Sequence, residues 1–308
     1  MVNSTPEPPR PPFHIQDDFI ETPFEQRFQG PLQDAWLQRS WHVLAASPGS
    51  GKSMGIHDLV VHSGAHKTAR ETYIPILAIR APLEKREQSL EMAFSAALGV
   101  SPSMRPNVRR TWLERTMADV SVECIIIDNA HILSLSHFRY LKELTDILAA
   151  PPYRRRISLC LVVTNSGDTI PLKDDFFDSP DILQRQFLRR MDIERPFFVI
   201  QDQSEEEVRQ VLAAFEKLYS GQFPDLNLRR WATYIFTSLT NPVLDPDGTR
   251  RVTMALLTRF VESALRRVYM QGATDVDAAV LEEVTKLMIS GHDKTMPGDD
   301  EPPDKLLT

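Results

Sequence analysis

The sequence predicts an α/β domain built around a five-stranded parallel sheet, followed by a small helical domain. Apolar segments of strand length alternate with helix-like segments from residue 41 to residue 201, which is typical of parallel sheets with right-handed crossovers. After about residue 203 the strand-like segments stop and four helical segments follow. We expect a flexible proline-rich lead, an α/β domain with an N-terminal helical segment, a helical lid and a disordered acidic tail, over residues 1–16, 17–203, 204–290 and 291–308.

The five predicted strands are short, apolar and bounded by proline or polar residues. They cover residues 41–46, 72–82, 122–131, 157–168 and 195–201. The helices predicted between them cover residues 52–63, 89–100, 109–120, 138–150 and 179–191. Ser179 and Pro180 suit the cap and first turn of the last of these helices. Before the first strand, residues 17–38 have the spacing of one or two short amphipathic helices.

Composition and charge exclude several classes of protein. No apolar run approaches the roughly 20 residues of a membrane helix, and the acidic, proline-rich start lacks the apolar stretch of a signal peptide, so we expect a cytoplasmic protein. The two cysteines, Cys124 and Cys160, lie in apolar runs and are expected to be buried thiols. The net charge of −7 does not indicate a nucleic-acid binder, but it permits a local basic surface.

The strongest chemical motif is A-S-P-G-S-G-K-S at residues 46–53, between a predicted strand and a predicted helix. It matches the phosphate loop G-x-x-x-x-G-K-[ST] except for Ala46 in place of the first glycine. Glycines in such a loop let backbone N–H groups turn toward phosphate oxygens. Lys52 is expected to reach the outer phosphates and Ser53 to hold Mg²⁺. The residues predicted to bind ATP are Ser47, Pro48, Gly49, Ser50, Gly51, Lys52, Ser53 and Met54.

The segment C-I-I-I-D-N-A-H predicts a metal-binding acid at the end of the third strand. Asp128 would lie at the carboxyl edge of the sheet, where open α/β sheets bind ligands, and would complete the Mg²⁺ site with Ser53. Asn129 follows where ATP-hydrolysing proteins of this class usually carry glutamate, and an amide is not a useful base. We therefore hypothesise good ATP binding with slow hydrolysis. His131 is either a substitute base or a loop residue that is simply polar or faces DNA.

Polar and basic residues further along the chain complete the candidate site. Thr164 and Asn165 end the fourth strand, where a polar side chain can sense the γ-phosphate. The following helix carries three candidates for an arginine finger that reaches a neighbouring subunit's γ-phosphate, although a solvated helix face is the alternative for each. These candidates are Arg185, Arg189 and Arg190. Arg251, in the helical domain, is a candidate lid arginine that folds back on the nucleotide.

Over residues 30–290 these motifs, in this order, resemble an AAA+ P-loop NTPase. Within that class the chain looks similar to the TnsC/TniB/MuB group of transposition regulators, including TnsC of CRISPR-associated transposons. The resemblance rests on Y-I-P-I-L-A-I-R-A-P, a helix ending A-L-G-V, I-I-I-D-N-A-H-I-L and R-R-R-I-S-L-C-L-V-V-T-N-S-G-D. It implies an ATP-dependent ring or filament on double-stranded DNA, without sequence preference. It also implies recruitment of a transposase and a target selector of TniQ type. Ala46 and Asn129 depart from the usual pattern, and Asn129 puts hydrolysis in doubt.

Basic residues in and after the loop that precedes the helix predicted over 109–120 are candidates for DNA contact. We favour Arg105, Arg109 and Arg110 together with His131, because the first three lie in or after a loop that leads toward the family's central pore. Such clusters are also common on solvated faces. Two rival readings stay open: an AAA+ remodelling ATPase with fast turnover, and an initiator-like nucleotide switch not tied to transposition.

Overall fold

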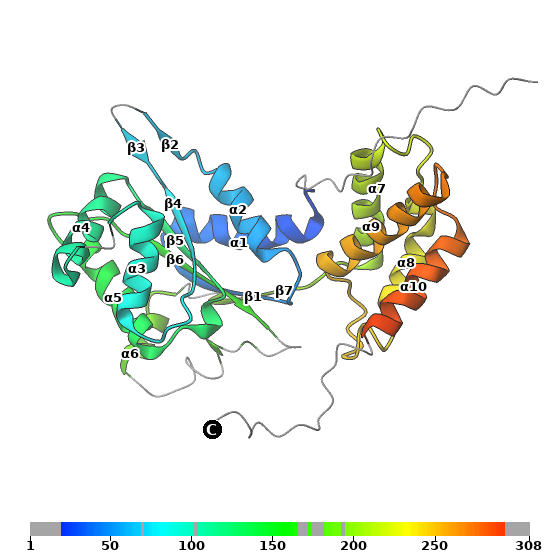
Figure 1. The fold of residues 1–308 in the computed structure, drawn as a ribbon. Coiled ribbons are helices and arrows are strands. Elements are labelled where there is room, and N and C mark those ends of the chain that lie inside the picture. Colours follow the sequence, from blue (N-terminus) through cyan, green and yellow to red (C-terminus); the bar gives the residue numbers. More distant parts are fainter. Residues whose placement is uncertain are drawn as a thin grey trace, which may run out of the picture. The chain divides into compact units, whose positions relative to one another are not determined.

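The carboxyl ends of five parallel strands meet at one edge of a single sheet (Figure 1). The computed structural model describes residues 20–68, 71–101, 104–165, 170, 172–173, 182–191 and 195–292. The predicted lead (1–16), the helix start at Ser179 and Pro180 and almost all of the predicted acidic tail lie outside the described residues. The chain divides into two compact units, residues 21–203 and residues 204–308 with the first 20 residues.

The sheet has the strand order β4-β5-β6-β1-β7, and every neighbouring pair is parallel. The strands are β1 (Trp41–Ala46), β4 (Ile76–Arg80), β5 (Cys124–Asp128), β6 (Ser158–Thr164) and β7 (Phe197–Ile200). Continuous apolar runs form these strands because a parallel sheet is buried on both faces. This confirms the predicted α/β fold class with its five-stranded parallel sheet.

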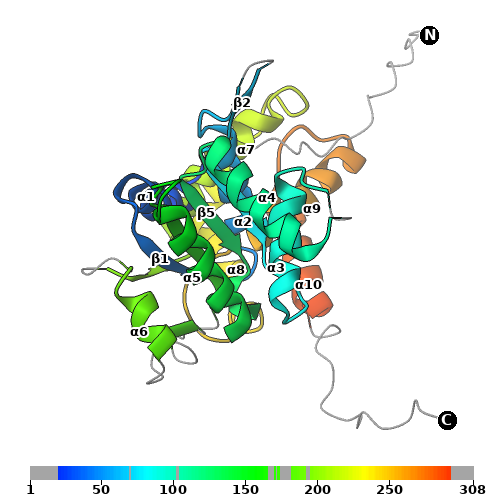
Figure 2. The ribbon, with the colours of Figure 1, turned by 90° about the vertical axis from the view of Figure 1, so that its left-hand side faces the viewer.

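Helices cover both faces of the sheet, and alternate side chains of each strand meet different helices (Figures 1 and 2). Leu44, Ile126 and Val162 pack on the helices of one face, and Val43, Ile127 and Leu161 pack on those of the other. The first face carries α1 (Pro23–Gln38) and α2 (Lys52–Val61). The second carries α3 (Glu87–Ala97), α4 (Pro106–Asp119), α5 (Leu135–Ala149) and α6 (Ile182–Leu188), with η1 (Ala130–Ile132) between β5 and α5.

One local feature differs from the expectation, and the N-terminal segment takes one of the two forms expected for it. The strand predicted over 72–82 is interrupted at Pro75, which lacks the N–H group that a ladder needs. Its first residues form β3 (Thr72–Tyr73), an antiparallel partner of β2 (His66–Lys67). The N-terminal segment is one helix, α1, which begins after Thr22, whose hydroxyl accepts a hydrogen bond from Glu25 N–H at 3.2 Å.

The second unit is helical and has its own apolar core, as the sequence predicts. Ser204 and Glu207 form a capping box at the start of its first helix, and Gly272 ends its longest helix in the left-handed conformation. The helices are α7 (Glu205–Tyr219), η3 (Arg229–Trp231), α8 (Ala232–Leu239), α9 (Met254–Gln271) and α10 (Ala278–His292).

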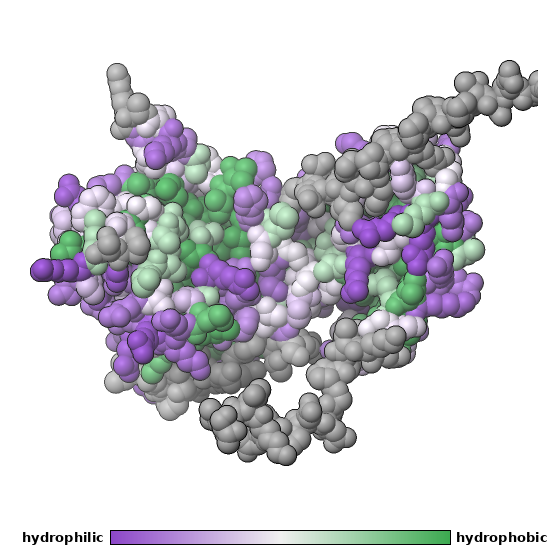
Figure 3. Space-filling model, viewed as in Figure 1, coloured by the Kyte–Doolittle hydropathy of each residue, from purple (hydrophilic) through white to green (hydrophobic). Residues whose placement is uncertain are grey.

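Both cysteines are buried free thiols on neighbouring strands of the first unit. In the part of the chain that the structure describes, no helix is both long and apolar enough to cross a membrane. Figure 3 shows hydrophobic colour gathered over α2 and β4, and two α2 residues, Met54 and Val61, are at least half exposed.

Candidate functional site

The phosphate loop joins the end of β1 to the start of α2, as its sequence predicts. Gly49 and Gly51 have φ angles of 72° and 107°, a region that favours glycine. Gly51 is the N-cap of α2, and its carbonyl accepts a hydrogen bond from Gly55 N–H at 3.0 Å. The first N–H groups of a helix lack partners within the helix, so this turn presents donors suited to phosphate oxygens.

Ala46, which replaces the first glycine of the pattern, is the last residue of β1. It is fully buried and pairs with Thr164 of β6 and Ile200 of β7. This position is ordinary strand, so it needs none of the conformational freedom of glycine. The departure from the pattern therefore leaves the loop geometry intact.

Lys52 is buried against the loop that it follows. Its Nζ donates hydrogen bonds to the carbonyl oxygens of Ala46 (2.9 Å) and Ser47 (2.7 Å), and its residue is 7% exposed. Burial lowers the pKa of Lys52 from its usual value, while the carboxylates of Asp128 and Asp202 oppose that shift. Sequence reasoning missed Asp202, which lies just after β7. An acid that follows the fifth strand is the signal that points to it.

Ser53 and Asp128 meet at the sheet edge. The Ser53 hydroxyl donates to Asp128 Oδ2 at 2.6 Å, and Asp128 Oδ1 accepts from Asn129 N–H at 2.8 Å. A hydroxyl and a carboxylate are hard oxygen ligands of the kind that Mg²⁺ prefers. The two residues thus fit the metal role expected of them, with buried Ser50, whose hydroxyl has no partner among the described residues, in the adjoining loop.

Asn129 is held in a specific orientation by an arginine. It has a φ of 56°, in the left-handed region that asparagine tolerates. In the amide orientation that satisfies both groups, its Oδ1 accepts from Arg80 Nε (3.1 Å) and Nη2 (3.2 Å). The amide oxygen is therefore engaged, and the amide nitrogen is a donor that cannot take a proton from water. The role of Arg80, the last residue of β4, was not predicted.

His131 and the end of β6 lie at the same edge. The Nδ1 atom of His131 accepts a hydrogen bond from Thr164 N–H at 3.3 Å, and Asn165 N–H donates to the Ala46 carbonyl at 3.3 Å. Burial, followed by the nearby charge of Lys52, lowers the pKa of His131, while Asp128 raises it. The structure thus brings His131, which was also a DNA-contact candidate, beside the phosphate loop.

The three candidate finger arginines have different surroundings. Arg190 donates to Thr145 Oγ1 at 3.1 Å, pairs with Asp146, and lies over the ring of Trp41 at 5.0 Å. It is thus held on α5. Arg185 and Arg189 are exposed and form no ion pair with another described residue. Only these two keep the freedom that a finger needs.

Arg251 belongs to the helical unit, where its Nη1 lies 3.8 Å from Glu207 Oε2. Glu207 is also part of the capping box of α7. Its expected role as a lid arginine stays a prediction.

Two of the three arginines expected to contact DNA are engaged within the protein. Arg109 is 6% exposed, and its Nε pairs with Glu91 Oε1 at 2.6 Å. Arg110 contacts Glu87, Glu114 and Glu143 and lies over the ring of Tyr140. Helix α4 turns both side chains toward the acids of α3 and α5, which does not fit the expected DNA contact. Arg105, just before α4, is exposed.

Helix α1 packs very closely on the phosphate-loop helix. A Cβ atom at Gly55 would lie 3.0 Å from Phe28 Cδ1 and 3.3 Å from Glu25 Oε1. Gln29 Nε2 donates to the Gly55 carbonyl (3.1 Å) and to Asp58 Oδ2 (2.9 Å). Burial, and then the charge of Asp58, raises the pKa of Glu25 to about 7.

Residues 37–170 match the family described as an AAA domain. Among solved structures, Cdc6p from Pyrobaculum aerophilum is 14% identical, with a TM-score of 0.60 over 90% of this chain and 69% of that one. ORC2 of Aeropyrum pernix, in ADPNP–ADP complexes, is 10% identical, with a TM-score of 0.60 over 88% and 70%. ORC1 of the same organism, in complex with DNA, is 11% identical, with a TM-score of 0.54 over 87% and 66%. No curated protein matches the chain.

The fold is thus that of the AAA+ P-loop NTPases, with a helical C-terminal part. The family match identifies an AAA domain over residues 37–170 of the chain, most of the first unit. At identities this low the neighbours bear on the fold alone. The narrower resemblance to the transposition regulators stays a prediction.

Proposed function

We propose that this chain is an ATP-dependent, DNA-binding AAA+ regulator of DNA transposition that hydrolyses ATP slowly. It would assemble as a ring or filament on double-stranded DNA and recruit a transposase and a target selector of TniQ type. The observation that carries the nucleotide part is the meeting of Lys52, Ser53 and Asp128 at one sheet edge. The transposition part rests on the sequence resemblance.

Different residues at this edge would bind different parts of MgATP. The phosphate loop and the N-terminus of α2 would bind the phosphates through backbone N–H groups, with Lys52 as the cation. Ser53 and Asp128 would hold Mg²⁺. When bound, Mg²⁺ neutralises developing phosphate charge and orients the oxygens. Asn165 and His131, at the ends of neighbouring segments, would face the outer phosphate.

Slow hydrolysis follows from the chemistry of Asn129. Its amide oxygen accepts hydrogen bonds from Arg80, and an amide has no basic group that could take a proton from the attacking water. Loss of a general base costs about 10²–10⁴ in rate. A long-lived ATP state suits a protein that assembles on DNA and waits for a partner. Arg185 or Arg189 would act across the subunit interface.

Calorimetry and electron microscopy test this proposal in two stages. Calorimetry with Mg²⁺ and a non-hydrolysable ATP analogue should detect binding, and no binding would overturn the nucleotide role. Negative-stain images with ATP and duplex DNA should then show rings or filaments that coat the DNA. Isolated hexamers with fast turnover would favour a remodelling ATPase instead.

DNA contact can be measured separately through its salt dependence. Each phosphate contact adds about one to the slope of log affinity against log salt. Arg105→Ala should lower that slope by about one if this exposed residue touches DNA. Arg115→Ala, which removes an exposed arginine paired with Asp119 on the same helix, is the matched control.

An initiator-like nucleotide switch is the second candidate. It is favoured by the structural likeness to Cdc6p and the ORC proteins, one of which was solved in complex with DNA. Nucleotide-dependent discs that form without DNA, and no effect on a transposase, would favour this reading.

A further inference from the structure

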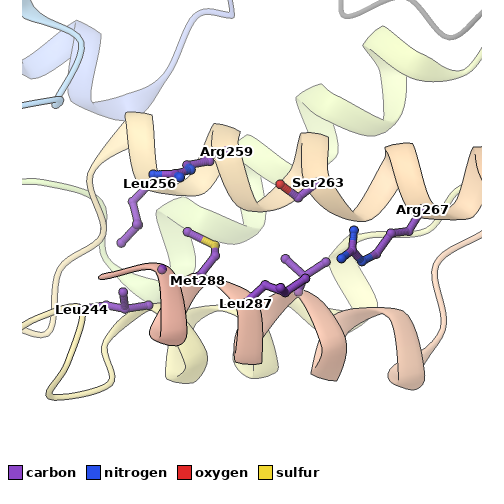
Figure 4. A pocket seen from close by; sticks show the side chains of 9 residues that line it. Leu244, Leu256, Arg259, Ser263, Arg267, Leu287 and Met288 are labelled. Carbon is purple, nitrogen blue, oxygen red and sulfur yellow. The ribbon is translucent and has the colours of Figure 1, made fainter. Parts of the chain in front are cut away.

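The helical unit carries a groove between α9 and α10 that the nucleotide site does not use. It has a volume of about 190 Å³ and is open to solvent (Figure 4). Its apolar lining comes from Leu244, Leu256, Val284, Leu287 and Met288. Leu287 is 51% exposed, so its side chain offers apolar surface at the groove.

One wall of the groove is polar and basic. Arg259, Ser263 and Arg267 are four residues apart on α9, so they share one face of the helix. Arg259 is exposed and forms no ion pair with any described residue. Arg267 Nη2 lies 3.2 Å from Glu283 Oε1, but its Nε–H is buried without a hydrogen-bond partner in the described part of the chain. An apolar floor with unused cationic donors suits an acidic segment that carries leucines.

We infer that this groove is the docking site of the chain's own C-terminal tail, residues 293–308. Gly291 lines the groove, so the tail begins at its rim. The tail contains five acids and two bases, a net charge of −3, and an acidic run at Asp299, Asp300 and Glu301. Near its end it carries Leu306 and Leu307. The charges complement the arginine row, and the leucines complement the apolar floor.

Residues 293–308 are long enough to reach along the groove, and because they are tethered to it, weak contacts are enough to hold them there. The sixteen residues of the tail span at most about 55 Å when extended. The arginine row is shorter, because Arg259 and Arg267 are eight helical residues, or about 12 Å, apart. A short tether gives an effective concentration of about millimolar. Because exposed ion pairs contribute only about 0–1 kcal/mol each and are screened by salt, the docked tail can be released. The groove is thus a covered surface that an acidic partner can compete for.

Disulfide trapping in the full-length chain tests the inference. Leu287→Cys combined with Leu306→Cys should form an intrachain disulfide at least ~10-fold faster than Met270→Cys combined with Leu306→Cys. Met270 is the matched control, since it is 78% exposed on α9 but does not line the groove. Equal rates, or disulfides that join two chains, would overturn the inference.

Charge variants separate docking from random encounter. Arg259→Glu in the trapping background should reduce the disulfide rate to that of the control pair, and Arg266→Glu, an exposed neighbour that does not line the groove, should leave the rate unchanged. Replacing Asp299, Asp300 and Glu301 by Asn, Asn and Gln should act like Arg259→Glu without altering the folded core. If neither charge change slows trapping, electrostatic docking is wrong.

Discussion

The edge of the sheet at the phosphate loop and the layer formed by α3, α4 and α5 both hold charged residues that the sequence singles out. At the sheet edge, Lys52 and Ser53 at the start of α2 lie together with Asp128 at the end of β5, as expected. In the helical layer, Arg109 and Arg110 point at acids of neighbouring helices instead of outward. Strand ends and glycine conformations fix where side chains go, whereas a cluster of like charges in a sequence does not.

The largest effect should come from supplying the missing base. Asn129→Glu is expected to raise ATP turnover by about 10²–10⁴-fold, because a carboxylate can then accept the proton of the attacking water. Arg80 remains beside it to orient the new side chain. Asn129→Gln has the same length without a base, so phosphate release by the two variants should differ. Equal rates would mean that the base lies elsewhere, with His131 the next residue to substitute.

The second largest effect should be on stability, through the buried ion pair between Arg109 and Glu91. Arg109→Ala leaves the Glu91 carboxylate buried without its partner, which is expected to lower the free energy of unfolding by about 3–5 kcal/mol. Arg115→Ala breaks an exposed pair and should cost about 0–1 kcal/mol. Urea unfolding measures both, and a double variant, Arg109→Met with Glu91→Met, should recover most of the loss. If the Arg109→Ala protein were instead stable and bound DNA more weakly, Arg109 would be a DNA contact, as the sequence predicts, and not a structural residue.

Lys52→Ala should weaken binding of a non-hydrolysable ATP analogue by about 2–5 kcal/mol, or roughly 30- to 5,000-fold. The reason is the loss of the buried cation that we propose to bind the phosphates. Lys286→Ala removes a lysine that pairs only on the surface of α10, and it should leave calorimetric affinity unchanged. Unaltered affinity in Lys52→Ala would place the nucleotide elsewhere.

The smallest expected effect is the pH dependence from Glu25. Its pKa is about 7 in the folded protein against an ordinary 4.5, so the folded state keeps a proton that the unfolded state loses. The contribution of Glu25 to the free energy of unfolding is fully present below pH 4.5. It is lost as the pH rises through 7, by at most about 3 kcal/mol. Glu25→Gln should therefore be more stable than the parent at pH 8 and similar at pH 4.5 in urea titrations. Glu84→Gln, at an exposed site, should show no such difference.

Features fixed by local sequence were predictable. The apolar runs give the five strands, and G-S-G-K-S between a strand and a helix places Lys52 and Ser53 at the sheet edge. The meeting of Asp128 with Ser53 follows from parallel topology, which brings the carboxyl ends of the strands to one edge of the sheet. Ala46 fits in place of the glycine of the pattern because it is the last residue of β1.

Features that depend on which side chains meet across elements were not predictable. The Arg80–Asn129 contact joins the ends of two strands, and Asp202 reaches Lys52 from a third. The direction of Arg109 depends on the rotation of α4 about its axis, which a mixed polar sequence does not specify. The hairpin of β2 and β3 has strands of two residues, too short for any periodicity to appear.

The close packing of α1 on α2 at Gly55 restricts how the two helices can move relative to each other. With Phe28 and Glu25 already against the glycine, and Gln29 hydrogen-bonded to its carbonyl, no slack remains between the two helices. Any displacement of the first turn of α2 would therefore displace α1 as well. The N-terminal helix is thus mechanically coupled to the helix that follows the phosphate loop.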